Sequence, residues 1–501
     1  MPARIASVNV TYAVRSRAVP SIPDVAWPIV GLLAGVALAI AALYAHPAIF
    51  AMAAVFAIAA GLALYEPRLI GPMLALALPL EISKLAFPVL ETRSELGGGL
   101  GPTSIVDAGR IMVAVAFAVW LIRPRRARSD VLPSSPLTMP LALLFAVYAL
   151  STLYAVDASA ARTESLRLLF SMGMFALIPF FVRDRASLRW TLYAIVFAMA
   201  ALSLVGIYEE AAGKFLWNAG LGLYGERRIN ATFADPNHFA RFLLEGIVVA
   251  LVLWFFVGRR AKFAFLLPAM LVAILTQEFT GSRGSWVVGV VTLPLAVAAL
   301  PVARSLRLRM LGMGVALLVL AALVVAAFNP YFSKRVDTFK FGFNAAGARP
   351  YLVEAGLSMF RDHPLAGVGA GGYQASFEED YYSYKDPKIK ANVTMSHTSA
   401  VTIMAELGAI GIVAVAFVAA RWAMFVRSAS GRSEGELRAV LAGVALISAI
   451  IFLGSQTEGR FLEDPFLWLA AGLAVAVDAI ARTEQRAPSL AAVVVEDLDE
   501  P

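Results

Sequence analysis

Histidine is scarce in this chain, so each of the four can be weighed for chemistry. His397 lies in Met-Ser-His-Thr-Ser, where a long polar segment ends and an apolar run begins. A neutral imidazole, with a pKa of about 6.5, could take a proton from a hydroxyl there. A structural role is the alternative, and turn or helix-start contexts favour that role for His46, His238 and His363.

Arginine is the second residue type of interest. Arg283 lies in Thr-Gly-Ser-Arg-Gly-Ser-Trp at the predicted start of an apolar helix. A cation in the first turn opposes the helix dipole at a cost of about 0.3–1 kcal/mol, so helix stability does not explain it. Free amides at a helix start and a guanidinium together favour a phosphate group. Arg227, Arg228 and Arg349 lie on the same predicted side, although interfacial arginines reaching lipid phosphates are the alternative.

Ionisable residues inside apolar runs also need a reason. Arg241 and Glu245 are four residues apart, which predicts a neutralising pair on one helical face. Glu406 follows His397 inside the next apolar run, in Ala-Glu-Leu-Gly-Ala-Ile-Gly. It is predicted either to orient the site or to cap a close helix contact that the glycines allow.

Metal and nucleotide sites are weaker interpretations. The acidic run Glu378-Glu-Asp380 could hold a hard cation, but such a run in a polar segment is usually solvated. The glycine-rich Gly367–Gly372 lacks the preceding strand of a dinucleotide-binding loop. The absence of cysteine excludes thiolate metal sites and cysteine nucleophiles. No metal and no cofactor are therefore expected.

The composition of the chain indicates which secondary-structure elements position these residues. Hydrophobic residues make up 60% of the 501 residues, against about 45–50% in a soluble domain, and charged residues only 15%. This excludes a soluble enzyme, a disordered chain and an outer-membrane barrel. The formal charge of +7 is expected to set orientation in a membrane, not to bind nucleic acid. The chain is predicted to be an all-α polytopic membrane protein.

Fourteen apolar runs are long enough to cross a bilayer. They fall at about 28–44, 48–65, 69–88, 104–122, 138–156, 163–182, 188–208, 238–257, 262–279, 284–302, 308–328, 397–426, 437–454 and 461–481. Arginine and lysine collect beside alternate connections, at 123–128, 183–189, 259–262, 304–309 and 427–438. With a cytoplasmic N-terminus, every one of these clusters becomes cytoplasmic, as the positive-inside rule requires.

This topology divides the chain into six predicted segments. They are a cytoplasmic N-terminal segment (1–27), N-terminal transmembrane helices (28–208), central helices with outer arginine motifs (209–328), a periplasmic loop (329–396), C-terminal transmembrane helices (397–481) and an acidic cytoplasmic tail (482–501). The loop is the longest connection and includes a helical-looking stretch from Arg349 to Phe360. A connection of that length inside a compact protein is usually functional.

Five motifs occur in order around that loop. They are Arg228-Ile-Asn-Ala-Thr-Phe-Ala-Asp-Pro-Asn237, Thr280-Gly-Ser-Arg-Gly-Ser-Trp286, Gly347-Ala-Arg-Pro-Tyr351, His363-Pro-Leu-Ala-Gly-Val-Gly-Ala-Gly-Gly-Tyr373, and His397 followed by Ala405-Glu-Leu-Gly-Ala-Ile-Gly411. Over about residues 225–425, this set resembles the O-antigen ligase superfamily, which also holds O-antigen and exopolysaccharide polymerases. The first seven predicted spans carry no diagnostic motif.

The resemblance implies a GT-C-type glycosyltransferase in the bacterial inner membrane, with its site facing the periplasm and surrounded by membrane lipids. The donor would be a glycan on undecaprenyl diphosphate, and the acceptor a hydroxyl of lipid A-core or of a growing glycan. His397 matches the proposed base of such ligases, while Arg283 and Arg349 match loop arginines that bind the diphosphate. The residues expected to bind substrate are Arg228, Asn237, His363, Tyr373 and Glu406. Thr398 stands where the family often has asparagine.

Two alternatives stay open. A polymerase of the same superfamily would extend lipid-linked repeats, and no motif separates it from a ligase. A flippase of lipid-linked oligosaccharide would show charged residues along a central cavity and short loops. This chain concentrates its candidate residues in outer segments, which favours an enzyme over a flippase.

Overall fold

The computed structural model describes residues 47–81, 107–122, 135–215, 228–299, 304–328, 349–381 and 396–496. Within these ranges every regular element is a helix, so the prediction of an all-α chain is confirmed for the part that is described. The predicted first span at 28–44 lies outside it. The chain divides into two compact units, Met1–Val55 and Phe56–Pro501, and every helix from α3 onward belongs to the second.

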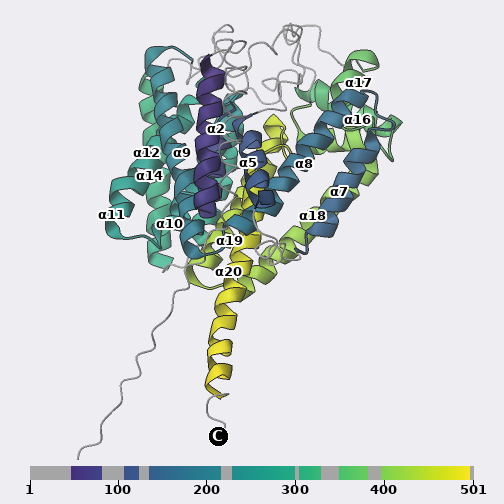
Figure 1. Cartoon of the computed structure of the whole chain (residues 1–501). Coiled ribbons are helices and arrows are strands. Elements are labelled where there is room, and N and C mark those ends of the chain that lie inside the picture. Colours follow the sequence, from purple (N-terminus) through teal and green to yellow (C-terminus); the bar gives the residue numbers. More distant parts are fainter. Residues whose placement is uncertain are drawn as a thin grey trace, which may run out of the picture. The chain divides into compact units, whose positions relative to one another are not determined.

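Most helices begin within a few residues of a predicted apolar run, although the helix within the run at 69–88 is only eight residues long and the last helix extends past 481. In chain order they are α2 (Pro47–Tyr65), η1 (Pro67–Leu69), α3 (Ile70–Ala77), α5 (Ala108–Ile122), α7 (Thr138–Ser151), α8 (Ala158–Phe181), α9 (Arg185–Ala212), α10 (Pro236–Trp254), α11 (Arg259–Ala261), η5 (Lys262–Leu266), α12 (Leu267–Phe279), α13 (Arg283–Ala299), α14 (Arg304–Phe328), α16 (Arg349–Asp362), α17 (Tyr373–Glu379), α18 (Ser399–Arg432), α19 (Gly435–Glu458) and α20 (Pro465–Glu496). Figure 1 shows α7 beside α18, and α20 extending beyond its neighbours.

Seven helical stretches in the described ranges are long and apolar enough to cross a membrane. They are α8, α9, α10, the continuous stretch Arg259–Phe279, α18, α19 and the Pro465–Arg486 part of α20. Five further apolar helices are shorter, among them α5, α7 and α13. These lengths and compositions are those of a multi-pass membrane protein. The predicted boundary at residue 482 does not mark a helix end, because α20 continues to Glu496.

Aspartate fixes where several helices begin. Asp184 accepts a hydrogen bond from the Ser187 amide (2.8 Å) before α9, and Asp235 accepts one from the Asn237 amide (2.7 Å) before α10. Asp157 caps α8 in the same way. A carboxylate at this position satisfies amides that lack a partner in the first turn and complements the positive end of the helix dipole. These local effects explain why helices begin within a few residues of the predicted runs.

The most completely buried helix is α10. Helices α9, α12, α13 and α19 pack around it. Two glycines allow the closest approaches: a Cβ at Gly246 would lie 2.5 Å from Met199 Sδ of α9, and one at Gly443 of α19 would lie 2.8 Å from Val252 Cγ2. Small residues at such positions let apolar helices pack closely. The start of α10 is thereby held in register with the ends of its neighbours.

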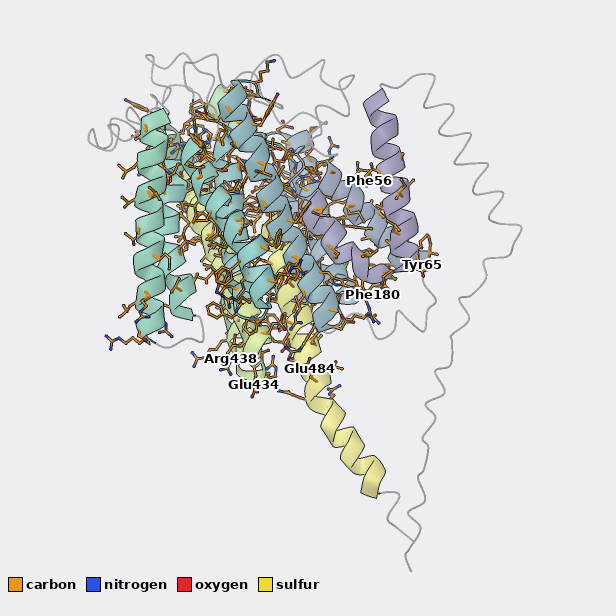
Figure 2. The ribbon with its side chains drawn as sticks, turned by 90° about the vertical axis from the view of Figure 1, so that its left-hand side faces the viewer. Phe56, Tyr65, Phe180, Glu434, Arg438 and Glu484 are labelled. Atoms are coloured by element: carbon orange, nitrogen blue, oxygen red, sulfur yellow. The ribbon has the colours of Figure 1, made fainter. Side chains whose placement is uncertain are left out.

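Basic residues gather at one end of this bundle, where acidic partners neutralise them. Glu436 of α19 accepts hydrogen bonds from Arg189 Nε (2.6 Å) and Arg185 Nη1 (3.3 Å), both in α9. Figure 2 shows three further charged residues at this end, Glu434, Arg438 and Glu484. The clusters at 183–189 and 427–438, which the sequence placed on one face, therefore lie together.

Helix α18 is interrupted at Gly408, and the glycine-rich segment after α16 fills the interruption. Gly408 has φ 61° and ψ −157°, which is not a helical conformation. Four main-chain hydrogen bonds join the two segments: the amides of residues 409 and 410 donate to the carbonyls of 364 and 365, and those of 368 and 369 donate to the carbonyls of 405 and 406. Irregular backbone within an apolar helix is tolerated where another segment satisfies it. The predicted loop is thus anchored in the helix that follows it, an insertion that the sequence did not predict.

Candidate active site

The starts of α13 and α18 meet at the end of α19. A Cβ at Gly284 of α13 would lie 2.3 Å from Thr457 Oγ1, so this helix start packs directly against α19. The backbone of His397 packs against Gly459, and its Cα would lie 3.9 Å from a Cβ there. Arg283 immediately precedes Gly284. Two residues that the sequence singled out for chemistry therefore flank the same helix end.

Helix α16 brings a second arginine to His397. A Cβ at Gly356 of α16 would lie 2.5 Å from Val401 Cγ1 of α18, and further along, the segment after α16 is hydrogen-bonded into the interruption of α18. The two helices therefore run in the same direction, and their starts lie at the same end. Arg349 begins α16 and is near enough to act electrostatically on His397.

The backbone at His397 is held in an unusual conformation. Its φ of 53° is left-handed, which costs a residue other than glycine about 1–3 kcal/mol. The neighbouring residues stabilise the turn, because the Thr398 amide donates to Ser396 Oγ at 3.1 Å, while Ser396 Oγ donates to the Thr398 carbonyl at 3.0 Å. The sequence carried no signal for this role of Ser396.

Burial lowers the pKa of His397 below its usual value, and the Arg349 guanidinium lowers it further, whereas the Asp235 carboxylate raises it. The imidazole is consequently neutral at neutral pH, the form that can accept a proton. Asp235 is the residue that caps α10. The start of α10 therefore also belongs to this end of the bundle.

Arg228 links the start of α10 to the turn before α13. Its Nε donates to the Thr280 carbonyl at 2.8 Å, and its Nη2 donates to Asn237 Oδ1 at 2.7 Å. Thr280 precedes Arg283 by three residues, so the two guanidiniums belong to neighbouring backbone segments. The predicted pair Arg228 and Asn237 is thus in direct contact, and the amide orients the guanidinium.

The starts of α13 and α18 lie at the end of α19, and charged groups at the starts of α16 (Arg349) and α10 (Asp235) act electrostatically on His397. A helix start carries a partial positive charge of roughly half an elementary unit, which the capping Asp235 offsets at α10. Arg228, Arg283 and Arg349 add full charges, and all three are half-buried, as is His397. A group with several negative charges would be stabilised here by both the amides and the guanidiniums.

The predicted pair between Arg241 and Glu245 is wrong. In the described structure Arg241 Nη2 lies 2.7 Å from Asp464 Oδ2, and Nη1 lies 3.4 Å from Glu458 Oε1. All of these side chains are buried, and Glu245 Oε2 has no hydrogen-bond partner in the described part of the chain. The true partners are Glu458, the last residue of α19, and Asp464, in the turn before α20, so the ion pairs hold the end of α19 and this turn against α10.

His363, Tyr373 and Glu406 lie around the glycine-rich segment. Glu406 accepts hydrogen bonds from the amides of Gly371 (2.9 Å) and Tyr373 (3.3 Å), and the Tyr373 hydroxyl donates to the Leu352 carbonyl. His363 follows the last residue of α16 and is exposed, about 20 Å along the helix from Arg349. The observed contacts of Glu406 and Tyr373 support the loop. A role of these three residues in substrate binding stays a prediction.

The acidic run that could have held a cation lies at the end of α17, where Glu378, Glu379 and Asp380 are all exposed. Across the ranges that the structure covers, no three histidine or acidic side chains are arranged to hold a metal ion. Whether catalysis needs a metal is a separate question, and metal independence stays a prediction.

Part of the chain matches a known protein family. Residues 268–416 match the sequence profile of the O-antigen ligase family. No curated protein matches the chain. The matched segment includes Arg283, Arg349 and His397, while Arg228 and Asn237 precede it. This match supports membership of the chain in the O-antigen ligase superfamily.

Proposed function

We propose that this protein is a glycosyltransferase that moves a glycan from undecaprenyl diphosphate to an acceptor hydroxyl at the periplasmic face of the bacterial inner membrane. Three observations carry the proposal: Arg349 acts electrostatically on His397, Arg283 begins a helix that packs on the same end of α19 as His397, and Arg228 is hydrogen-bonded to the turn before that helix. The family match supports the same class of reaction, which joins or extends surface polysaccharides.

The arginines stabilise the leaving group. When the bond between the anomeric carbon and the phosphate oxygen breaks, negative charge builds on the lipid diphosphate. Guanidiniums already held in place, such as that of Arg228 on Asn237 and Thr280, stabilise this charge without reorganising. The helix amides around them act in the same direction. The positive charge that the reaction requires is then supplied by the protein itself.

His397 activates the acceptor. Its neutral imidazole takes the hydroxyl proton while the acceptor oxygen forms a bond to the anomeric carbon, so that undecaprenyl diphosphate and an imidazolium result. Attack from the face opposite the diphosphate inverts the anomeric centre. The lowered pKa favours release of the proton afterwards, which restores the base for the next cycle.

We further propose a GT-C-type architecture of fourteen spans with both termini in the cytoplasm. The ion-paired basic end of the bundle supports this orientation, because the candidate site lies at the opposite ends of α9, α18 and α19. Reporter fusions at Ser376 and Gly431 should read periplasmic and cytoplasmic, respectively. The same side for both would contradict the proposed location of the site.

The decisive experiment uses the purified full-length protein in vesicles with an undecaprenyl-diphosphate-linked glycan. Lipid A-core is offered as acceptor in one arm, and a second lipid-linked glycan in the other. Transfer in the first arm indicates a ligase and in the second a polymerase, and either supports the proposed chemistry. Movement of the intact lipid-linked glycan across the bilayer without transfer would indicate a flippase and overturn the proposal.

A further inference from the structure

His238 is a second histidine at the candidate site, and its contacts do not explain why it is there. It is the third residue of α10 and only 9% exposed. Neither ring nitrogen has a hydrogen-bond partner in the described structure. Buried polar atoms normally have partners, so an imidazole with two unsatisfied nitrogens needs an explanation.

The surroundings of His238 locate it next to the proposed base. Its ring lies near the main chain of Glu458, although without the geometry of a hydrogen bond, and is close enough to His397 for the two side chains to interact electrostatically. Arg241 and Arg460 are its charged neighbours. His238 is therefore near both His397 and the buried ion pairs of Arg241 and Arg460.

Both neighbouring arginines already form ion pairs with carboxylates. Arg241 is paired with Asp464 and Glu458, and Arg460 Nη1 lies 2.7 Å from Glu81 Oε1. The sequence suggested a structural role for His238 at the start of its helix, but Asp235 is the residue that caps α10. Within the described part of the chain, the imidazole is left without a hydrogen-bond partner. An apolar side chain would fill the same space without the cost of burying polar atoms.

We propose that His238 hydrogen-bonds a sugar hydroxyl of the substrate next to His397 and so acts as a positioning residue. A neutral imidazole offers one N–H donor and one acceptor nitrogen, which match the two capacities of a hydroxyl. Arg228, Arg283 and Arg349 supply charge for a phosphate, whereas His238 supplies the neutral contact that a glycan needs. This inference rests on the proposed glycosyl transfer.

The test compares three variants of the full-length protein with the wild type in the transfer assay. His238→Phe keeps a buried ring but removes both hydrogen-bonding nitrogens. His238→Asn keeps one donor and one acceptor, although at a shorter reach. Phe239→Leu is the packing control, because Phe239 is the next residue of α10 and is fully buried and apolar. Each variant is assayed for KM of the acceptor, KM of the donor, kcat and thermal unfolding.

For His238→Phe we expect KM of one sugar substrate to rise roughly three- to tenfold, as the loss of one neutral hydrogen bond predicts, with partial recovery in His238→Asn. The substrate whose KM rises identifies the sugar that His238 contacts. Phe239→Leu should lower the unfolding temperature and leave both KM values unchanged. If the wild type is active and His238→Phe leaves both KM values unchanged, the role of His238 is refuted while the proposed function stands. An inactive wild type would instead reject the proposed function.

Discussion

Replacing Gly408 with alanine should destabilise the protein, although alanine is normally the better helix residue. The conformation at Gly408, with φ 61° and ψ −157°, is essentially restricted to glycine and costs other residues about 1–3 kcal/mol. The added Cβ would also lie 2.5 Å from the carbonyl group of Leu365, and overpacking of this kind costs about 1–3 kcal/mol more. Together these give a loss of about 2–6 kcal/mol, or roughly 30-fold to 10⁴-fold in the folding equilibrium.

Gly431 provides a matched control in the same helix. Nothing lies within 4 Å of a Cβ at Gly431, so Gly431→Ala should stabilise α18 by about 0.5–1 kcal/mol. Unfolding of the purified variants in detergent, followed by tryptophan fluorescence, gives the comparison. We expect Gly408→Ala to unfold at a clearly lower temperature than the wild type and Gly431→Ala at an equal or higher one. Equal stability of the two variants would refute the insertion of the glycine-rich segment into α18.

Three predictions concern the site itself. His397→Ala should lower turnover by about 10²–10⁴ while the protein stays folded, and His363→Ala should be milder; equal, small effects in the transfer assay would remove the general-base role. Arg283→Lys and Arg349→Lys should each lose most activity, because lysine lacks the planar fork of arginine, and EDTA should leave transfer intact. Inhibition by EDTA that Mg²⁺ reverses would indicate a metal-dependent enzyme. Arg349→Gln removes a cation that lowers the pKa of His397, so the acid limb of the pH–rate profile should move to higher pH. An unmoved limb would show that another group controls it.

The helical part of this fold could be predicted because its signals are local. The stretch from Arg349 to Phe360 was expected to be helical, and α16 spans Arg349–Asp362. Apolar runs specify which residues can be buried, and capping aspartates such as Asp184 and Asp235 mark where helices begin. Both effects act over a few residues, so they can be recognised without knowing where any other helix lies.

The order of the motifs also identified Arg283, Arg349 and His397, but their proximity depends on contacts between distant parts of the chain. Only the folded structure shows that Gly284 and His397 pack against the same end of α19. Close packing between segments that are far apart in the chain leaves no periodic pattern in the sequence.

The partners of Arg241 show the same limit most clearly. The sequence places Arg241 in an apolar run, where a guanidinium needs a carboxylate partner, and Glu245 is the nearest carboxylate on the same helical face. The tertiary structure decided that Glu458 and Asp464, more than 200 residues away, take that role. An ion pair forms between groups that are close in space. The residues within one helix turn of Arg241 are few, whereas packing of the bundle can bring a carboxylate from a distant segment of the chain next to it.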